Sequence, residues 1–417
     1  IIRELRARGY EFVPVSTLAG LTREQAMPHL VKAGESASGT GGVLFEAVRI
    51  GRQSIGWLFM TAIALGLVRV LSLSALALWQ ARRMAAKQDE ADVPPHLVPS
   101  FVSVLIPAFN EERVIEASVR RALGTQGVRV EVIVIDDGSK DATSAVVREA
   151  FGHDPRVRLL TLENGGKARA LNKGLEIAKG DVVVALDADT RFEPCTIAKL
   201  TRWFADPKIG AVAGNAKIGN RVNWLTRWQS IEYITAQNLE RRALEALGAV
   251  TVVPGAVGAW RRAALDAVGG YPADTLAEDQ DLTIAVQRAG WRVACDHEAI
   301  AWTEAPETVR ALFRQRYRWA FGTLQCLWKH SALIFRGQPR GLAWFGLPQA
   351  WVFQIGLGLI SPMIDLALVA GLVDAGVRTY NHGWGVMSQD LATMLAFCGA
   401  PEKFPRNHAA LMAAQPQ

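Results

Sequence analysis

Cysteine is scarce in this sequence, and the few cysteines lie far apart. The chain has four cysteines in 417 residues, and no two of them form a Cys-x-x-Cys pair. This spacing excludes a disulfide framework and a zinc site of the usual kind. We therefore expect ordinary buried thiols in a reducing compartment at Cys195, Cys295, Cys326 and Cys398.

The sequence also lacks a recognisable nucleic-acid-binding motif, although it is basic. Its formal charge is +6 and its pI is about 9.2. Half of its residues are hydrophobic and its mean hydropathy is +0.13, which is high for a purely soluble protein. We therefore expect the excess of lysine and arginine to serve an anionic lipid surface and an anionic substrate, and no nucleic acid.

The chain begins with isoleucine, and no signal peptide precedes its first apolar stretch. We therefore treat it as a piece of a longer protein. Residues 1–30 contain the run Ile-x-x-Leu-x-x-x-Gly-Tyr-x-Phe-Val-x-Val-x-x-Leu. This run resembles the closing segment of polysaccharide deacetylase domains. So short a remnant cannot supply the metal ligands of a deacetylase, so we expect no such activity from it.

Two stretches are apolar enough to suggest membrane helices. Residues 55–79 form a run long enough to span a bilayer, with Trp57 and Trp79 near its ends, where interfacial aromatics belong. Arg69 inside this run is costly in lipid, so we expect it to face protein or water. A second candidate covers residues 344–373 and is interrupted by two prolines.

Between these stretches the sequence alternates apolar strands with helical segments. Continuous Val/Ile/Leu runs occupy residues 102–106, 130–135 and 181–186, and a helical pattern over residues 166–179 stops at Gly180. Such strands separated by helices predict a parallel sheet covered on both faces. Ligands of such sheets bind outside the carboxyl ends of the strands.

Polar side chains follow each of these three strands, in segments 107–112, 136–139 and 187–189. A lone aspartate at a strand end is most often a turn former or a helix cap. Two acidic strand ends, each after a buried strand, are harder to explain in that way. Alternation in an extended segment would place Asp187 and Asp189 on one side. Paired carboxylate oxygens suit Mg²⁺ or Mn²⁺ bridging a diphosphate.

Six motifs then occur in order: Pro-Ala-Phe-Asn-Glu-Glu, Asp-Asp-Gly-Ser-Lys-Asp, Asn-Gly-Gly-Lys-Ala-Arg-Ala-Leu-Asn, Asp-Ala-Asp, Glu-Asp-Gln-Asp-Leu and Gln-Arg-Tyr-Arg-Trp. This series resembles the processive family 2 glycosyltransferases, which include cellulose, chitin, hyaluronan and poly-N-acetylglucosamine synthases. The resemblance covers roughly residues 101–330. It implies a GT-A-like, Rossmann-like α/β domain with a mostly parallel sheet covered by helices, joined to transmembrane and interfacial helices.

The resemblance also implies roles for the residues that match the family motifs. Asp136 would hold the uridine of a UDP-sugar donor, and Lys167 would lie near the nucleotide and its diphosphate. Asp187 would contact the nucleotide-sugar, and Asp189 would ligate Mg²⁺ or Mn²⁺.

The general base is expected in the Glu-Asp-Gln-Asp motif. An acceptor hydroxyl is a poor nucleophile, so a carboxylate must take its proton during attack on the anomeric carbon. A divalent cation would neutralise the departing diphosphate, and direct displacement would invert the anomeric configuration. Asp281 is an equal candidate by residue type, and Glu278-Asp279 could simply begin a solvated helix. The family pattern selects Asp279.

The Gln-Arg-Tyr-Arg-Trp motif indicates processivity, because its counterparts in the family sit at the mouth of the active site. Trp319 would stack on the acceptor sugar, while Gln315 and Arg318 would help to close over the diphosphate. Aromatic and basic residues here could equally be lipid anchors in an interfacial helix. We expect Trp328 and Arg310 to be lipid anchors of this kind.

These observations predict the organisation of the chain. UDP-sugars are made in the cytoplasm, so the catalytic domain is expected on the cytoplasmic side of the inner membrane of the cell, in a multi-pass protein. A growing polysaccharide acceptor, the lipid bilayer and a small membrane accessory subunit are the expected partners. The predicted segments are a deacetylase-like remnant (1–30), a transmembrane helix (55–79), a linker (80–100), a catalytic domain (101–306), interfacial helices (307–335), a transmembrane segment (344–373) and a tail (374–417).

Further motifs favour one polymer. Val-Ala-Gly-Asn-Ala-Lys-Ile-Gly-Asn at residues 212–220 and Val-Pro-Gly-Ala at residues 253–256 resemble poly-β-1,6-N-acetylglucosamine synthases. The resemblance implies a UDP-N-acetylglucosamine donor and a β-linked exopolysaccharide of the kind found in biofilms. The alternatives are a hyaluronan-, chitin- or cellulose-type synthase, a non-processive membrane glycosyltransferase, and a degenerate membrane scaffold without activity.

Overall fold

The computed structural model describes residues 6, 7, 9, 35–88 and 98–382. Nearly all of the predicted deacetylase-like remnant, part of the predicted linker, the end of the tail and Cys398 lie outside the described residues. The chain divides into two units, residues 1–65 and 66–417, and every predicted site residue lies in the second unit.

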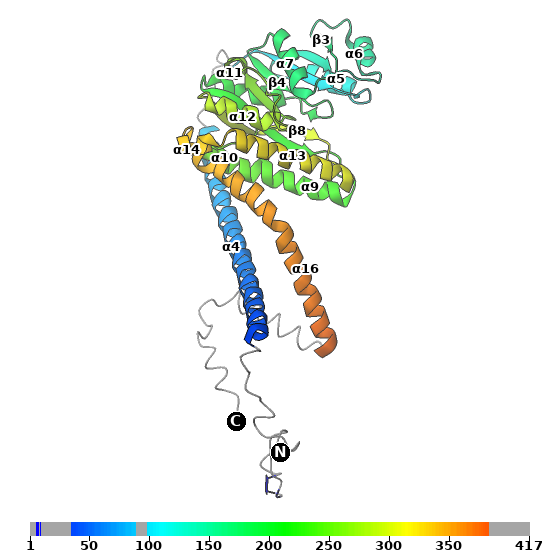
Figure 1. Ribbon diagram of the computed structural model, residues 1–417. Helices are drawn as coiled ribbons and strands as arrows, with labels where there is room; N and C mark the ends of the chain where they lie inside the picture. The colour runs from blue at the N-terminus through cyan, green and yellow to red at the C-terminus, as the bar shows by residue number, and fades with distance from the viewer. Residues whose placement is uncertain (1–5, 8, 10–34, 89–97, 383–417) are drawn as a thin grey trace. The chain divides into compact units, whose positions relative to one another are not determined.

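The second unit contains a β-sheet flanked by helices (Figure 1). The sheet has eight strands in the order β3-β2-β1-β4-β7-β6-β8-β5. Strands β3, β2, β1 and β4 are parallel, β7 is antiparallel to both of its neighbours, and β5 is antiparallel to β8. The prediction of a mostly parallel sheet is therefore confirmed, with two reversed strands that it did not include. The strands are β1 (Phe101–Ala108), β2 (Arg129–Asp136), β3 (Val157–Thr161), β4 (Val182–Ala185), β5 (Arg191–Phe192), β6 (Ile209–Ile218), β7 (Gly258–Arg261) and β8 (Arg292–Thr303).

Helices cover both faces of this sheet, as predicted. Successive residues of one strand enter opposite cores: Val104 and Ile106 of β1 belong to one apolar cluster, and Leu105 belongs to the other. Burying one such side chain stabilises the fold by roughly 1.5–3 kcal/mol relative to leaving it exposed. The helices of the domain are α5 (Ile115–Leu123), α6 (Thr143–Phe151), α7 (Lys167–Ile177), α8 (Thr196–Thr201), η3 (Arg202–Ala205), α9 (Trp224–Ile234), η4 (Thr235–Glu240), α10 (Arg241–Ala246), α11 (Arg262–Val268) and α12 (Glu278–Arg288).

The expected end of the helix before β4 is wrong. Helix α7 ends at Ile177, and the backbone is already extended at Ala178, so Gly180 does not stop it. Gly180 instead lies against β1, where a Cβ atom would come within 2.6 Å of the Ser103 backbone nitrogen. A side chain at this position would therefore push the start of β4 away from β1.

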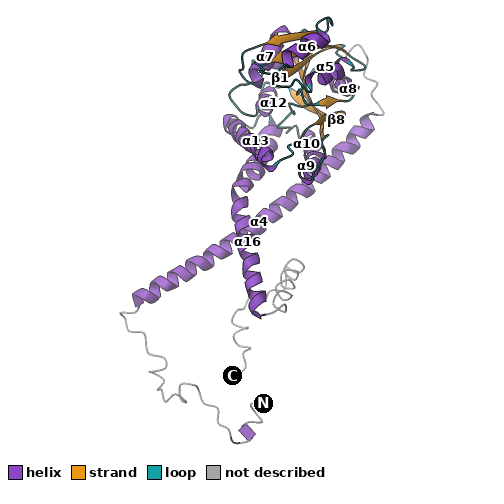
Figure 2. Ribbon diagram, turned by 90° about the vertical axis from the view of Figure 1, so that its right-hand side faces the viewer, coloured by secondary structure: helices purple, strands orange, loops and turns teal. Residues whose placement is uncertain are grey.

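Helix α13 (Val309–Lys329) follows the sheet and packs against α12 (Figure 2). After it come α14 (Ala332–Arg336), η5 (Leu342–Gly346), α15 (Leu347–Gln349), η6 (Ala350–Gly356) and α16 (Leu357–His382). The π-helical segments η5 and η6 flank Pro348, the first proline of the predicted second span. Helix α16 continues past residue 373, so part of the predicted tail is helical.

Helix α4 (Glu35–Gln88) contains the first predicted span and extends beyond both of its ends. Residues 80–88, predicted as the start of a linker, are therefore helical. Within the described residues, Gly56–Met84 and Leu342–Met363 are long and apolar enough to cross a bilayer. Arg69 faces protein, as expected, because its guanidinium donates hydrogen bonds to Glu240 at 2.6 Å and Gln349 at 2.9 Å.

Candidate active site

The acidic strand ends meet at one edge of the sheet. In the parallel register Ala108 at the end of β1 lies beside Asp136 at the end of β2, and Leu105 lies beside Ala185 at the end of β4. Asp187 follows two residues after β4. The polar segments that follow these strands therefore lie at one edge of the sheet, as parallel topology requires.

Asp136 lies at this edge with protein partners for both carboxylate oxygens. It is only 2% exposed. One oxygen accepts a hydrogen bond from the Ser139 backbone N–H at 2.8 Å, and the other accepts one from the Ser144 hydroxyl. These bonds fix the carboxylate in the turn that follows β2. Its role toward a uridine stays a prediction.

The neighbouring Asp137 holds the glycine loop that leads to Lys167. Its two carboxylate oxygens accept hydrogen bonds from the backbone N–H groups of Gly165 at 2.9 Å and Gly166 at 2.7 Å. Gly166 has φ of 89°, a conformation that favours glycine, immediately before α7 begins at Lys167. Asp137 therefore determines where Lys167 enters the site.

Lys167 is the centre of a cluster of acidic side chains. Its ammonium nitrogen lies 2.6 Å from a carboxylate oxygen of Asp187 and 3.4 Å from one of Glu278. Asp279 joins the cluster through Gly255, whose backbone N–H donates to Asp279 Oδ2 at 3.2 Å. A Cβ atom on Gly255 would lie 2.9 Å from Lys167 Nζ. Residues more than a hundred positions apart in sequence therefore share one small volume.

The charges in this cluster do not balance, and the pKa values reflect this. Burial alone would lower the pKa of Lys167, but the carboxylates of Asp187 and Glu278 outweigh it and raise that pKa. Burial raises the pKa of Asp279, and the neighbouring charge of Glu278 raises it further, against an opposing effect of Lys167. The cluster thus holds an excess of carboxylate, and Asp279 binds a proton more readily than an ordinary aspartate.

Asp189 adds to this excess. Burial and the charge of Asp187 raise its pKa, and burial and the charge of Asp189 raise the pKa of Glu111. Groups of three or more metal-ligating side chains are absent from the part of the chain that the structure describes. The carboxylates near Asp189 are hard oxygen ligands, but they are too few to surround a metal ion completely. Such a site fits Mg²⁺ or Mn²⁺, which commonly take their remaining ligands from water and substrate phosphates.

The Gln-Arg-Tyr-Arg-Trp motif lies on α13, and about one turn after it Gly322 packs tightly against the segment that leads to Asp279. A Cβ atom on Gly322 would come within 2.8 Å of Ala277 Cβ. Gln315 and Trp319 precede Gly322 by seven and three residues, so they share its face of the helix. Trp319 is 36% exposed, and the guanidinium of Arg316 lies 4.7 Å from the centre of its ring. Within the described structure, no hydrogen bond or ion pair links Gln315, Arg318 or Trp319 to the carboxylate cluster.

A family model described as glycosyltransferase like family 2 matches residues 99–322, which is more than half of the chain. An N-acetylglucosaminyltransferase from Rhizobium leguminosarum bv. viciae is 32% identical over 289 residues, which are 64% of this chain and 68% of the relative. The chain belongs to the family 2 glycosyltransferases. It therefore contains the domain that characterises this family of sugar transferases.

Other relatives extend this finding. Poly-beta-1,6-N-acetyl-D-glucosamine synthases of Staphylococcus aureus are 32% identical to this glycosyltransferase over 222 residues, which cover 53% of this chain and 54% of theirs. The chain therefore spans about half the length of these curated relatives. A mannosyltransferase from Pyrobaculum calidifontis, solved with GDP-Man and Mn²⁺, has the same fold, with a TM-score of 0.51, 24% identity, and coverage of 78% of this chain and 97% of that one.

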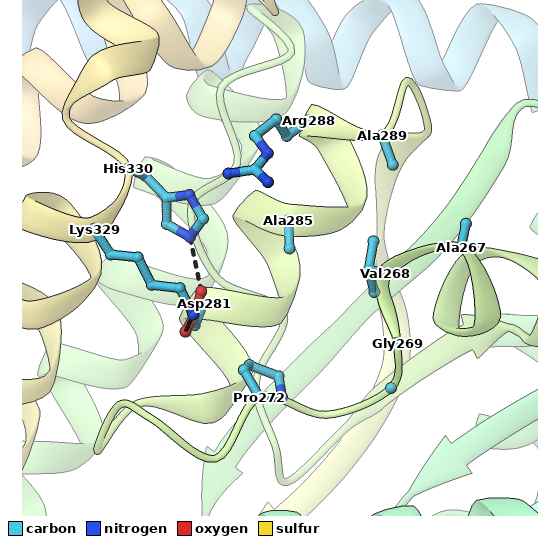
Figure 3. Close-up of a pocket in the computed structure, with 11 residues that line it drawn as sticks. Ala267, Val268, Gly269, Pro272, Asp281, Ala285, Arg288, Ala289, Lys329 and His330 are labelled. Carbon is cyan, nitrogen blue, oxygen red and sulfur yellow. Dashed lines mark hydrogen bonds and ion pairs between the residues drawn. The ribbon is translucent and has the colours of Figure 1, made fainter.

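The structure separates the two candidate bases of the glycosyltransferase. Asp281 is fully buried and points toward His330 and Lys329 (Figure 3): it lies 2.7 Å from His330 Nε2 and 2.8 Å from Lys329 Nζ. Burial would raise the pKa of Asp281, but the hydrogen bonds from His330 and Lys329 outweigh it and lower that pKa. The cavity of about 400 Å³ beside this pair contains none of the predicted site residues. Asp281 therefore joins α12 to the end of α13, and Asp279 is the carboxylate that faces Lys167.

Three residues of the cluster were given no role from sequence. Glu278 contacts Lys167, Gly255 contacts Asp279, and Asp137 positions the loop before Lys167. Each lies inside one of the sequence motifs given above, so the motifs already indicated that these positions belong to the site. One expectation about thiols is wrong, because Cys195 is exposed, whereas Cys295 and Cys326 are buried.

Proposed function

We propose that this family 2 glycosyltransferase polymerises N-acetylglucosamine from UDP-N-acetylglucosamine into a β-linked exopolysaccharide. The observation that carries the proposal is the placement of Asp279, at the start of α12, beside the Lys167–Asp187 ion pair. This arrangement puts a carboxylate of raised pKa next to a cation that suits a diphosphate. The staphylococcal and rhizobial relatives, a poly-β-1,6-N-acetylglucosamine synthase and an N-acetylglucosaminyltransferase, support the choice of N-acetylglucosamine.

The reaction is a direct displacement. The acceptor hydroxyl attacks the anomeric carbon while Asp279 takes its proton, and the bond from that carbon to the UDP oxygen breaks. The carbon is attacked from the side opposite the leaving group, so an α-linked donor gives a β-linked product. Lys167 neutralises charge on the diphosphate, and Asp187 contacts the donor.

A divalent cation, Mg²⁺ or Mn²⁺, would be held by Asp189 and would neutralise charge on the departing diphosphate. Support comes from the excess of carboxylate at Asp189 and Glu111 and from the Mn²⁺ in the mannosyltransferase of like fold. We expect activity to stop in excess chelator and to return when either metal is added. Full turnover in excess chelator would contradict the role of Asp189.

The remaining roles concern the uridine and the acceptor. Asp136 would hold the uridine at the end of β2. Trp319 would stack on the acceptor sugar at the mouth of the site, and its exposure is consistent with this role. Gln315 and Arg318 would help to close over the diphosphate. Successive transfers would then extend a polymer that stays bound between cycles.

We also propose that the enzyme works at the cytoplasmic face of the inner membrane and passes its polymer through it. The two apolar stretches, Gly56–Met84 and Leu342–Met363, support this. Large apolar side chains exposed on α13, among them Phe313 and Trp328, suit an interfacial position. A bilayer-spanning pathway would need more helices than these, so an accessory subunit or further parts of the protein would contribute.

The test is a donor screen with membranes that contain the full chain. We expect incorporation from UDP-N-acetylglucosamine into a product that a poly-β-1,6-N-acetylglucosamine hydrolase degrades. Incorporation of glucose instead would favour a cellulose-type synthase, and alternating incorporation with glucuronic acid would favour a hyaluronan-type synthase. Asp279→Asn should abolish polymer and leave UDP binding largely intact. Loss of UDP affinity in this variant would contradict the assignment of the base.

A second candidate is a non-processive N-acetylglucosaminyltransferase. The rhizobial relative, which is matched over a greater length, carries that name without mention of a polymer. Product length in excess donor distinguishes the two functions. Long chains support the synthase, whereas short products at every donor concentration support the second candidate.

A further inference from the structure

A second cavity lies on the domain, away from the carboxylate cluster. Its volume is about 420 Å³, and it is formed where β6 and β8 meet the continuous helical stretch α9–η4–α10. None of its residues has a role in the proposed reaction. Its polar and basic lining includes Asn215, Lys217, Arg221, Arg242 and His297.

Three basic side chains line this cavity, and none of them forms an ion pair with another described residue. Lys217 lies over the ring of Trp302 at 5.6 Å, and Arg221 donates to the backbone oxygen of Ile218 at 3.3 Å. Arg242 makes no ion pair within the described residues. Glu298 also lines the cavity, and its carboxylate lies 3.5 Å from the guanidinium of Arg202, which lies outside the cavity. The cavity is therefore positive, which favours an anion.

Two side chains that line the cavity each carry a buried polar atom with no hydrogen-bond partner in the part of the chain that the structure describes: Asn215 Oδ1 and His297 Nε2. Asn215 is only 4% exposed. Its amide nitrogen donates to the His297 backbone oxygen at 2.9 Å. A carbonyl oxygen can only accept, so this bond fixes the orientation of the amide and leaves Oδ1 as an acceptor without a donor.

His297 is neutral in this setting. Burial, together with the charges of Arg242 and Arg241, lowers its pKa to about 3. A neutral imidazole does not supply the positive charge of the cavity, and its free nitrogen can bond a hydroxyl group. The cavity thus combines cations for an anionic group with two uncharged atoms for hydroxyl groups.

We propose that this cavity binds a phosphate ester that carries hydroxyl groups. Lys217, Arg221 and Arg242 would contact the phosphate oxygens, and a hydroxyl group would donate to Asn215 Oδ1. A glycerol-phosphate lipid headgroup and a soluble sugar or glycerol phosphate share this chemistry.

The surroundings favour the lipid as the source. Ile234 lines the cavity and is the last residue of α9. The same helix exposes Trp228 at 64% and Ile231 at 62%. An apolar helix face that ends at a basic cavity matches a lipid whose chains lie along the helix while its headgroup enters the cavity.

Binding to the purified full chain in detergent tests the proposal directly. Native mass spectrometry would count bound phosphatidylglycerol against phosphatidylcholine, and equilibrium dialysis would measure glycerol 1-phosphate against inorganic phosphate. We expect phosphatidylglycerol to bind at least tenfold more tightly than phosphatidylcholine, and glycerol 1-phosphate more tightly than phosphate. Binding of glycerol 1-phosphate without phosphatidylglycerol would support the site and assign it to a soluble ester. Equal binding of glycerol 1-phosphate and inorganic phosphate would overturn the proposal.

Variants locate the binding. Lys217→Gln combined with Arg242→Gln should weaken binding at least tenfold, and Arg221→Gln, a surface change that folding should tolerate, should weaken it severalfold. The matched control is Arg227→Gln, an exposed cation of α9 outside the cavity, which should change binding less than twofold. Wild-type affinity in the Arg221 variant, or equal losses in the Arg227 variant, would overturn the proposal. These readouts are independent of sugar transfer, so they fail or succeed separately from the proposed reaction.

Discussion

At the scale of single residues, the pairing of Glu278 with Asp279 sets the pH range of the proposed base. Burial and the charge of Glu278 raise the pKa of Asp279, and Lys167 opposes them. Glu278→Gln removes the negative neighbour and leaves Lys167 free of one competing carboxylate, and both changes lower that pKa. The base stays ionised to lower pH, so the acid limb of kcat/KM against pH, measured as UDP release, should move to lower pH.

The control for this prediction is an exposed carboxylate outside the site. Glu176→Gln removes a partner of Lys173 on the outer face of α7 and should leave the acid limb in place. An acid limb of the Glu278 variant that stays unchanged, or that moves to higher pH, would mean that Asp279 is not the group that titrates.

Some contacts of the site residues could be predicted from the sequence, and others could not. The approach of Asp187 to Lys167 follows from their positions, one after a strand and one at the start of the neighbouring helix. The contact of Gly255 with Asp279 does not, because it depends on how an irregular loop packs against α12. The internal bonds of Asp136 to Ser139 and Ser144 were equally invisible, because they depend on the shape of the turn after β2.

At the scale of elements, the fit of α13 against the segment before Asp279 depends on Gly322. Alanine is a better helix former than glycine by about 1 kcal/mol, so Gly322→Ala would stabilise the protein if the site were open. The added Cβ would instead lie 2.9 Å from the Ala277 backbone nitrogen, which must shift. We expect a net loss of about 1–3 kcal/mol and a lower Tm, with a loss of transfer activity. Ala320→Val, on the exposed side of α13, should retain activity; a raised Tm for Gly322→Ala would refute the tight contact.

Helix α12 is joined to the end of α13 by a buried ion pair that is open to a separate test. Asp281→Asn removes the partner of His330 and Lys329, and breaking a buried pair costs roughly 3–5 kcal/mol. The pKa of Asp281 is lowered in the folded state, so its contribution is present above the unfolded pKa and is lost as pH falls through the folded one. Thermal unfolding should therefore show a large loss at pH 7 that shrinks in acid. Asp266→Asn, which breaks an exposed pair with Arg262, should change stability by less than about 0.5 kcal/mol.

The sequence predicted those elements whose pattern is local. Continuous apolar runs located β1, β2 and β4, and a helical pattern located α7 to within two residues. The sequence did not indicate the reversed strand β7. The direction of a strand depends on the loops and helices that connect it to its neighbours, and it produces no periodic pattern of apolar residues. The sequence also did not indicate the exposed apolar face of α9, where tryptophans could equally have belonged to a core.

At the scale of the whole molecule, the family and the sheet could be predicted because several motifs occur in a fixed order. The boundaries of the membrane segments could not. Helix α4 continues through polar residues up to Gln88, since a helix does not end where hydropathy falls. The second apolar stretch is divided among η5, α15, η6 and α16, which reflects proline and packing more than composition.

The exposed tryptophans of α9 give a test of how the catalytic domain meets a bilayer. Trp224 is 69% exposed and Trp228 is 64% exposed, and indole rings favour the membrane interface. In the full chain reconstituted with brominated lipids, Trp224→Phe with Trp228→Phe should remove a clear share of the lipid-dependent quenching of tryptophan fluorescence. Trp203→Phe, which removes a half-buried indole bonded to Asp296, should leave that quenching unchanged. Equal quenching in the α9 variant and the wild type would mean that this face contacts water or another protein, and the interfacial position of the domain would then have to rest on α13 alone.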